Sequence, residues 1–153
     1  MQLSENFKLK EMLVSQTATR HNYGEQWQPT ELVIANLKAV CKKALQPIRN
    51  QFGVILVTSG YRCLRLNRAI GSGDGSDHVR GYAADFISPN YSELMMAKWI
   101  QKNINYDQLI LEFGSLKSPS WLHISVNPRM RNQILHIDRS GARILTRVEL
   151  QAL

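Results

Sequence analysis

Two histidines and one aspartate have neighbours that favour the binding of a divalent metal ion. His78 follows the glycine-rich stretch GSGDGSD, and Asp85 comes seven residues later within the apolar run AADFI. A carboxylate inside an apolar strand is costly to bury unless it is paired or bound to a metal. His123 stands in another strand-like run, WLHIS. Two imidazoles and one carboxylate suit zinc, and three protein ligands leave a fourth position for water, as in catalytic zinc sites.

The chemistry expected of such a site is hydrolysis. Zinc lowers the pKa of its bound water to about 7, which provides a hydroxide nucleophile at neutral pH. The same ligand types form the facial triad of iron(II) oxygenases, which we keep as an alternative. Those enzymes usually have an H-x-D spacing on a longer all-β barrel, whereas this chain has a spacing of seven and much predicted helix. The remaining histidines, His21 and His136, lack partners at ligand spacing and are expected to be surface or core residues.

The elements that must position these residues predict an α+β fold. Apolar positions three and four apart predict a long helix from Thr30, with Pro47 kinking or shortening its last turn and Gly53 ending it. The β-branched run from Val54 predicts a buried strand. Further helices are expected within 6–22, 63–71 and 92–103, and further strands over 82–88, 107–113, 121–126, 133–137 and 142–148. We expect a single domain over residues 1–153, with helices packed on one face of a mainly antiparallel sheet.

Composition narrows the possible partners. The net charge of +7 favours polyanions such as an acidic cell-wall polymer. The basic residues are scattered rather than clustered, so nucleic-acid binding is not expected. The first residues contain no apolar signal core, and no stretch has the length of a membrane span, so we expect synthesis in the cytoplasm without a signal peptide. Cys41 and Cys63 are expected to be free, buried thiols, and the protein is expected to be a monomer.

The residues around His78 form a longer pattern. Ser76, His78, Gly81, Ala83 and Asp85 together spell S-x-H-x-x-G-x-A-x-D. With TSGYRCLRLN before it, WLHIS after it and LSENFKLKEML near the start, the chain resembles the zinc D,D-carboxypeptidase and L-alanyl-D-glutamate endopeptidase family. That family includes the vancomycin-resistance D,D-dipeptidases and many phage endolysins. The resemblance extends from about residue 3 to residue 127 and is absent from the last 25 or so residues.

The resemblance implies roles for individual residues. It implies Zn2+ as the cofactor, His78, Asp85 and His123 as its ligands, and a fold of the Hedgehog/D,D-peptidase type. Arg62 aligns with an arginine that holds a substrate carbonyl or carboxylate, and its alternative role is an ion pair that packs the loop. Ser76 is expected to hold its loop or to contact substrate. Gly81 is expected to let the chain pass close to the metal.

The general base departs from the family pattern. Many relatives have a glutamate three residues before the last histidine, where this chain has Ser120. The nearest candidate is Glu112, whose apolar neighbours would raise its pKa, although a surface carboxylate at a strand end is the alternative. Asp107 is a weaker candidate. Trp121 is expected to face away from His123 and to belong to the core.

Together these features predict a zinc metallopeptidase that cuts the peptide stems of peptidoglycan. A phage-type lytic enzyme, released to the periplasm by a partner pore, and a D,D-carboxypeptidase both fit. Because fold and metal do not guarantee chemistry, the alternative is a non-catalytic, metal-bearing module that binds the cell wall.

Overall fold

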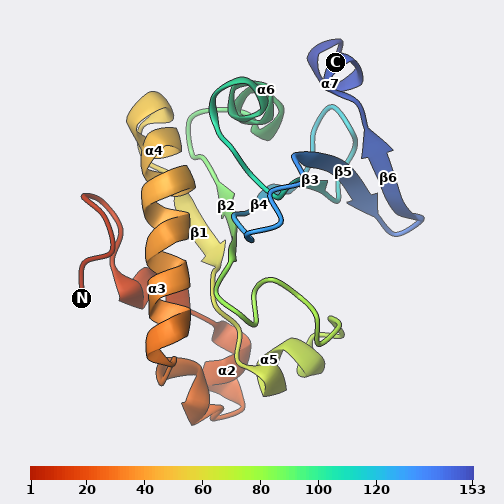
Figure 1. Cartoon of the computed structure of the whole chain (residues 1–153). Helices are drawn as coiled ribbons and strands as arrows, with labels where there is room; N and C mark the ends of the chain where they lie inside the picture. The colour runs from red at the N-terminus through yellow and green to blue at the C-terminus, as the bar shows by residue number, and fades with distance from the viewer.

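A six-stranded mixed sheet forms the centre of the computed structural model, which describes residues 1–153 (Figure 1). The strands are β1 (Leu56–Ser59), β2 (Ala83–Ile87), β3 (Gln108–Glu112), β4 (Trp121–Ser125), β5 (Gln133–Asp138) and β6 (Gly141–Leu145). Their order is β1-β2-β4-β3-β5-β6, and every neighbouring pair is antiparallel except β3 and β5. The predicted α+β fold with a mainly antiparallel sheet is therefore confirmed.

Nine helical segments accompany this sheet, and the two longest begin at side-chain caps. The nine are α1 (Leu9–Leu13), α2 (Gln16–Arg20), η1 (Gly24–Trp27), α3 (Glu31–Val40), η2 (Cys41–Leu45), α4 (Gln46–Phe52), α5 (Leu64–Ala69), α6 (Glu93–Asn103) and α7 (Arg147–Gln151). Thr30 and Ser92 accept hydrogen bonds from the first turns of α3 and α6. The predicted long helix runs through α3, η2 and α4 and ends at Gly53, which has a φ of 76°.

Pro47 does not shorten that helix. The wider π turn of η2 ends at Leu45, two residues before Pro47, and α4 then continues to Phe52. A proline nitrogen has no proton to donate to the carbonyl four residues earlier, and π turns are a known way for a helix to absorb such an irregularity. The helix therefore keeps its length, and the irregularity lies within it.

The two faces of the sheet have different chemistry. One face carries Ala84, Phe86, Leu109, Leu111, Leu122 and Ile124, which belong to a core cluster of 27 buried residues. Helical residues of the same cluster, such as Leu37 and Met96, pack against this face. Because side chains alternate along a strand, Asp85, Glu112 and His123 point to the opposite face. The polar residues of interest thus share one side of the sheet, and the apolar core lies on the other.

Strand β1 is less buried than expected. It pairs only with β2 and forms one edge of the sheet, so Leu56 is 49% exposed. The register shifts between Val57 and Ser59, as at a β-bulge. The β-branched run correctly predicted a strand, but it could not show that the strand has a neighbour on one side only.

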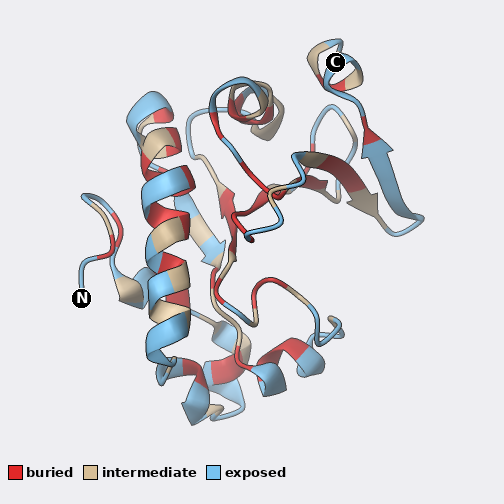
Figure 2. Ribbon diagram, viewed as in Figure 1, coloured by how far each residue is buried: buried red, intermediate tan, exposed pale blue.

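The C-terminal residues extend the sheet beyond β3. Strand β5 pairs in parallel with β3, and β6 returns antiparallel to it after the turn at residues 138–141, as predicted. Most of β6 is exposed (Figure 2). Through β5, the C-terminal segment therefore reaches the strand that carries Glu112.

The two cysteines are free and buried, as expected. Burial raises the pKa of the Cys41 thiol to about 12, so this thiol stays protonated. None of the helices combines the length and the apolar character that crossing a bilayer requires.

A buried carboxylate ties the start of β3 to the segment before β5. Asp107 is fully buried and accepts from Nε of Arg131 at 2.8 Å and from Nη2 of Arg131 at 2.9 Å. Nη2 of Arg129 adds a contact at 3.3 Å. Burial alone would raise the pKa of Asp107, but the hydrogen bonds from Arg131 outweigh it and hold the pKa below its usual range.

Asp107→Asn is therefore expected to lower the free energy of unfolding by about 2 kcal/mol at neutral pH, the usual scale for a hydrogen bond to a charged group. Because the folded-state pKa is depressed, the contribution is complete above the unfolded value of about 3.9 and is lost as pH falls through the folded value. Urea denaturation at several pH values checks this. A variant as stable as wild type at neutral pH, or a difference that grows in acid, would contradict it.

Candidate metal centre and active site

Three buried side chains bring one ligand atom each to a common point. The distances are 3.2 Å between His78 Nε2 and His123 Nδ1, 3.3 Å between His78 Nε2 and Asp85 Oδ1, and 3.0 Å between His123 Nδ1 and Asp85 Oδ1. A zinc ion with bonds of about 2.0–2.1 Å to tetrahedral ligands would separate those ligands by about 3.3–3.4 Å. The three residues could therefore hold a metal ion, and their nitrogen and oxygen donors fit zinc.

Neighbouring strands place two of these donors. Asp85 on β2 and His123 on β4 are direct partners across an antiparallel ladder, so their side chains leave the sheet side by side. His78 comes from the turn before β2, and its Nδ1 lies 2.7 Å from the carbonyl oxygen of Gly60. Because a carbonyl can only accept, Nδ1 carries the proton and Nε2 has its lone pair free for a metal.

The charge state of the group also suits a metal. Burial lowers the pKa of His78, which keeps this ring neutral. Burial would raise the pKa of Asp85, but the adjacent histidines hold it well below its usual range, so the carboxylate stays ionised. For His123, burial alone would lower the pKa, but the hydrogen bond to Asp85 outweighs it, so the pKa is raised overall. The raised pKa favours a proton on His123 in the absence of a metal, and a metal ion would compete with that proton, so binding would be weaker in acid.

Arg62 is fixed beside the metal group. Its Nη2 lies 3.4 Å from the second carboxylate oxygen of Asp85. Its Nε donates to Ser59 Oγ and its Nη1 to Asn67 Oδ1, both at 3.1 Å. The guanidinium also lines the cavity in front of His78 and His123. Arg62 therefore makes the packing ion pair that was its alternative role, and it faces the cavity as well.

Glu112 lies next to the three donors. Its Oε1 is 3.8 Å from His123 Nδ1, and its side chain is 17% exposed. Burial, assisted by the charge of Asp85, raises the pKa of Glu112 to about 7. The pairing of β3 with β4 puts Glu112 opposite Trp121, and the Ser120 amide donates to the Glu112 carbonyl oxygen at 2.9 Å. The hairpin thus brings the Glu112 carboxylate from β3 to the site. Ser120, which stands where many relatives have a glutamate, has no carboxylate.

The weaker candidate base, Asp107, belongs to a different cluster. Both its oxygens accept from Arg131, and it does not line the cavity that contains Glu112. His21 and His136 lie outside the metal-binding group. His136 is buried, and its Nε2 has no hydrogen-bond partner.

The cavity in front of the metal group has a volume of about 550 Å³ and an aromatic wall. Trp121 and Phe113 line it with ring centroids 5.2 Å apart, and Ile70 and Ile137 add apolar surface. The expectation that Trp121 faces away from His123 was wrong, because residues two apart on a strand point to the same face. Phe113 has a φ of 57°, a left-handed conformation that is uncommon for an aromatic residue and is often found at functional sites.

The loop before β2 is held by Ser76 and Gly81, in different ways. Ser76 Oγ accepts from the His78 amide at 3.3 Å, and Ser76 also lines the cavity. We expected Gly81 to let the chain pass close to the metal, but the structure shows a close approach to helix α3 instead. The φ of Gly81 is 77°, and a Cβ there would lie 2.9 Å from the carbonyl oxygen of Val33 on α3. Glycine is required by the left-handed backbone and by this contact with the helix.

Two buried amides that the sequence did not reveal support the site. Gln26 Nε2 donates to the carbonyl oxygens of Leu13 and Tyr61, and its Oε1 accepts from the Cys63 amide, all at 2.8 Å. Gln26 therefore brackets the loop that carries Arg62. Asn67 accepts from Arg62 and donates to the Gly73 carbonyl oxygen at 2.8 Å. No local pattern distinguishes either amide from exposed neighbours, because their partners are distant backbone groups.

A substitution at Gly60 tests whether its backbone positions the ring of His78. A Cβ at residue 60 would lie 2.4 Å from the carbonyl oxygen of Met12, so Gly60→Ala must displace the backbone that holds His78. We expect a loss of 10- to 100-fold in zinc affinity, the usual cost of losing such a supporting contact, together with lower stability. Competition against a chromophoric chelator measures the affinity. Gly24→Ala is the matched control, because a Cβ there meets nothing within 4 Å. Equal affinity in the two variants would contradict the positioning role.

The comparisons with known proteins agree with this geometry. The sequence profile of the family described as Peptidase M15 matches residues 5–125, which include His78, Asp85, Glu112 and His123. No curated protein matches the chain. Peptidases of this family are metallopeptidases that usually depend on zinc. Because the match covers well over half of the sequence, the chain belongs to the M15 family of peptidases.

Proposed function

We propose that this metallopeptidase uses zinc to hydrolyse amide bonds in the peptide stems of peptidoglycan. The observation that carries the proposal is the placement of Glu112, with its raised pKa, 3.8 Å from His123 within one cavity that Arg62 also lines. Site, family and cavity together support amide hydrolysis.

The metal site is assigned to His78, Asp85 and His123, with Nε2, a carboxylate oxygen and Nδ1 as donors. When bound by these residues, zinc would supply the Lewis acidity that polarises a substrate carbonyl and lowers the pKa of water towards neutrality. An iron(II) oxygenase is disfavoured, because the donors stand on a mixed sheet with a helical layer in a chain of the peptidase family.

Two further residues take part in the reaction, Glu112 by transferring a proton and Arg62 by stabilising negative charge. Glu112 takes a proton from the attacking water and passes it to the leaving amine as the amide C–N bond breaks. Its pKa near 7 suits both steps at neutral pH. Arg62 offers a fixed positive charge to the carbonyl oxygen on which negative charge develops. Ser76 lines the cavity, which supports a role in contacting the substrate backbone.

Peptidoglycan is proposed from the motif resemblance and the net charge of +7, which favours an anionic wall polymer. The site of action is then the cell wall, with a phage-type lytic enzyme or a D,D-carboxypeptidase as the two forms of the activity. The alternative is a non-catalytic module that binds the wall. It is disfavoured because a buried carboxylate beside the metal donors has an evident use in catalysis and none in wall binding.

Removal of the metal tests the chemistry. Treatment with EDTA should abolish the release of peptide fragments from purified peptidoglycan, and stoichiometric zinc should restore it. Mass spectrometry of the released fragments identifies the bond that is cut. Full activity after complete removal of the metal would refute the proposed mechanism.

Glu112→Gln tests the general base. The substitution keeps size and shape but removes the base, so we expect a 10²- to 10⁴-fold loss in kcat/KM with zinc affinity retained. Because Glu112 acts as a carboxylate, wild-type kcat/KM should fall as pH drops below an apparent pKa at or below about 7, since a bound cation can only lower the value. Glu5→Gln, at an exposed position, is the control. Near wild-type cleavage by Glu112→Gln would exclude this role.

A further inference from the structure

A second groove, of about 430 Å³, joins the active-site cavity at His123. The two hollows share Ser72, Ser76 and His123, so a substrate that lies across the metal group can extend from one into the other. Unlike the aromatic cavity, this groove is almost entirely polar, with Gln108, Arg129 and Arg131 along one side. Its chemistry suits a charged part of the substrate.

Both arginines come from the loop between β4 and β5, beyond the residues matched by the family profile. The loop has a defined shape. Met130 and Asn132 have φ values of 42° and 54°, and the Asn132 amide donates to the Tyr106 carbonyl oxygen at 3.1 Å. Left-handed backbone at two non-glycine residues persists only where surrounding contacts enforce it. The groove therefore combines residues within the family match with two arginines that lie beyond it.

The nearby carboxylates hold the arginines without covering them. Asp107 and Asp77 have side chains that are 0% and 6% exposed, whereas those of Arg129 and Arg131 are 52% and 38% exposed. A ligand in the groove therefore meets the cations first. Arg131 uses Nε and Nη2 on Asp107, and Arg129 uses only Nη2, so Nη1 of both residues donates to no protein atom. Arg131 is held by hydrogen bonds of 2.8 and 2.9 Å and Arg129 by longer contacts of 3.3 and 3.5 Å, so both guanidinium groups are oriented with donors to spare.

We propose that Arg129 and Arg131 form a subsite that binds a carboxylate of the substrate and thereby select acidic peptides. The inference rests on the proposed peptidase function and names the substrate class of the same site. Pre-positioned arginines match the geometry of a carboxylate, and charge-assisted hydrogen bonds are about twice as strong as neutral ones. The subsite lies on the far side of His123 from the aromatic wall, so the recognised carboxylate lies away from the apolar part of the substrate.

The test compares two substrates. One is a synthetic peptide-stem fragment with its free carboxyl groups, and the other is the same fragment with those groups amidated. The zinc-loaded wild type should prefer the free acid by about tenfold in kcat/KM, mostly through KM, which corresponds to about 1.4 kcal/mol. Arg129→Gln should bring this ratio close to one, and Arg129→Lys, which keeps the charge, should retain part of it.

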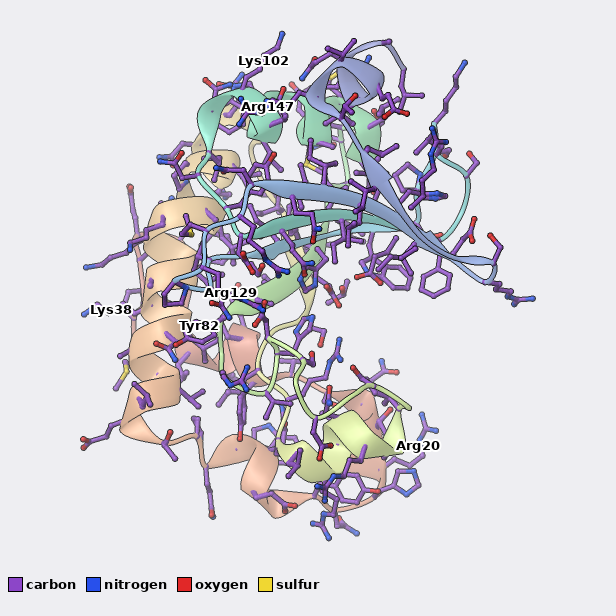
Figure 3. The ribbon with its side chains drawn as sticks, turned by 45° about the vertical axis from the view of Figure 1, so that its right-hand side comes forward. Arg20, Lys38, Tyr82, Lys102, Arg129 and Arg147 are labelled. Atoms are coloured by element: carbon purple, nitrogen blue, oxygen red, sulfur yellow. The ribbon has the colours of Figure 1, made fainter.

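Arg147→Gln is the matched control. Arg147 is an exposed arginine of the same C-terminal segment, but it does not line the groove and lies near the top of Figure 3 with Lys102, whereas Arg129 lies near the middle of the molecule. Arg147→Gln should keep the wild-type ratio. Urea denaturation verifies that Arg129→Gln is folded, and Arg131→Gln serves as a second variant that should also reduce the ratio.

The outcomes separate the two proposals. Equal cleavage of both fragments by wild type, or an unchanged ratio in folded Arg129→Gln, overturns the subsite and leaves the peptidase function standing. Cleavage of neither fragment, and of no bond in peptidoglycan, overturns the proposed function and the subsite with it.

Discussion

The site depends on the antiparallel register that sets Asp85 opposite His123. A slip of one residue between β2 and β4 would move one of these side chains to the apolar face of the sheet. That register is enforced from the other face, where Ala84 and Phe86 on β2 pack with Leu122 and Ile124 on β4 in the core. Burial of apolar surface therefore fixes the position of the two side chains that we propose as metal donors.

His78 and Arg62 are held instead by hydrogen bonds between polar groups. The Gly60 carbonyl orients the ring of His78, Gln26 brackets the loop of Arg62, and Asn67 joins Arg62 to the loop at Gly73. Burial makes each unpaired polar group expensive, so the network has few alternative arrangements. This rigidity fits the task of a hydrolytic site, which must hold a metal, a base and a cation in fixed relative positions.

Much of the fold followed from patterns in the sequence. The strands, the α+β class and the capped helices at Thr30 and Ser92 were predictable, because periodicity and caps are local signals. What a residue contacts across the chain was not. Edge placement of β1, the helix contact that requires Gly81, and the buried amide of Gln26 all depend on distant segments. Trp121 was misplaced for a simpler reason, since strand alternation in fact puts it on the face of His123.

Zinc-edge anomalous diffraction from crystals of the zinc-loaded protein tests the central claim most directly. One strong peak is expected, about 2.0–2.2 Å from His78 Nε2, a carboxylate oxygen of Asp85 and His123 Nδ1, with a remaining position open towards Glu112. A peak held by other residues, a fourth protein side chain closing the coordination sphere, or no peak at this group would contradict the assignment of a catalytic zinc site.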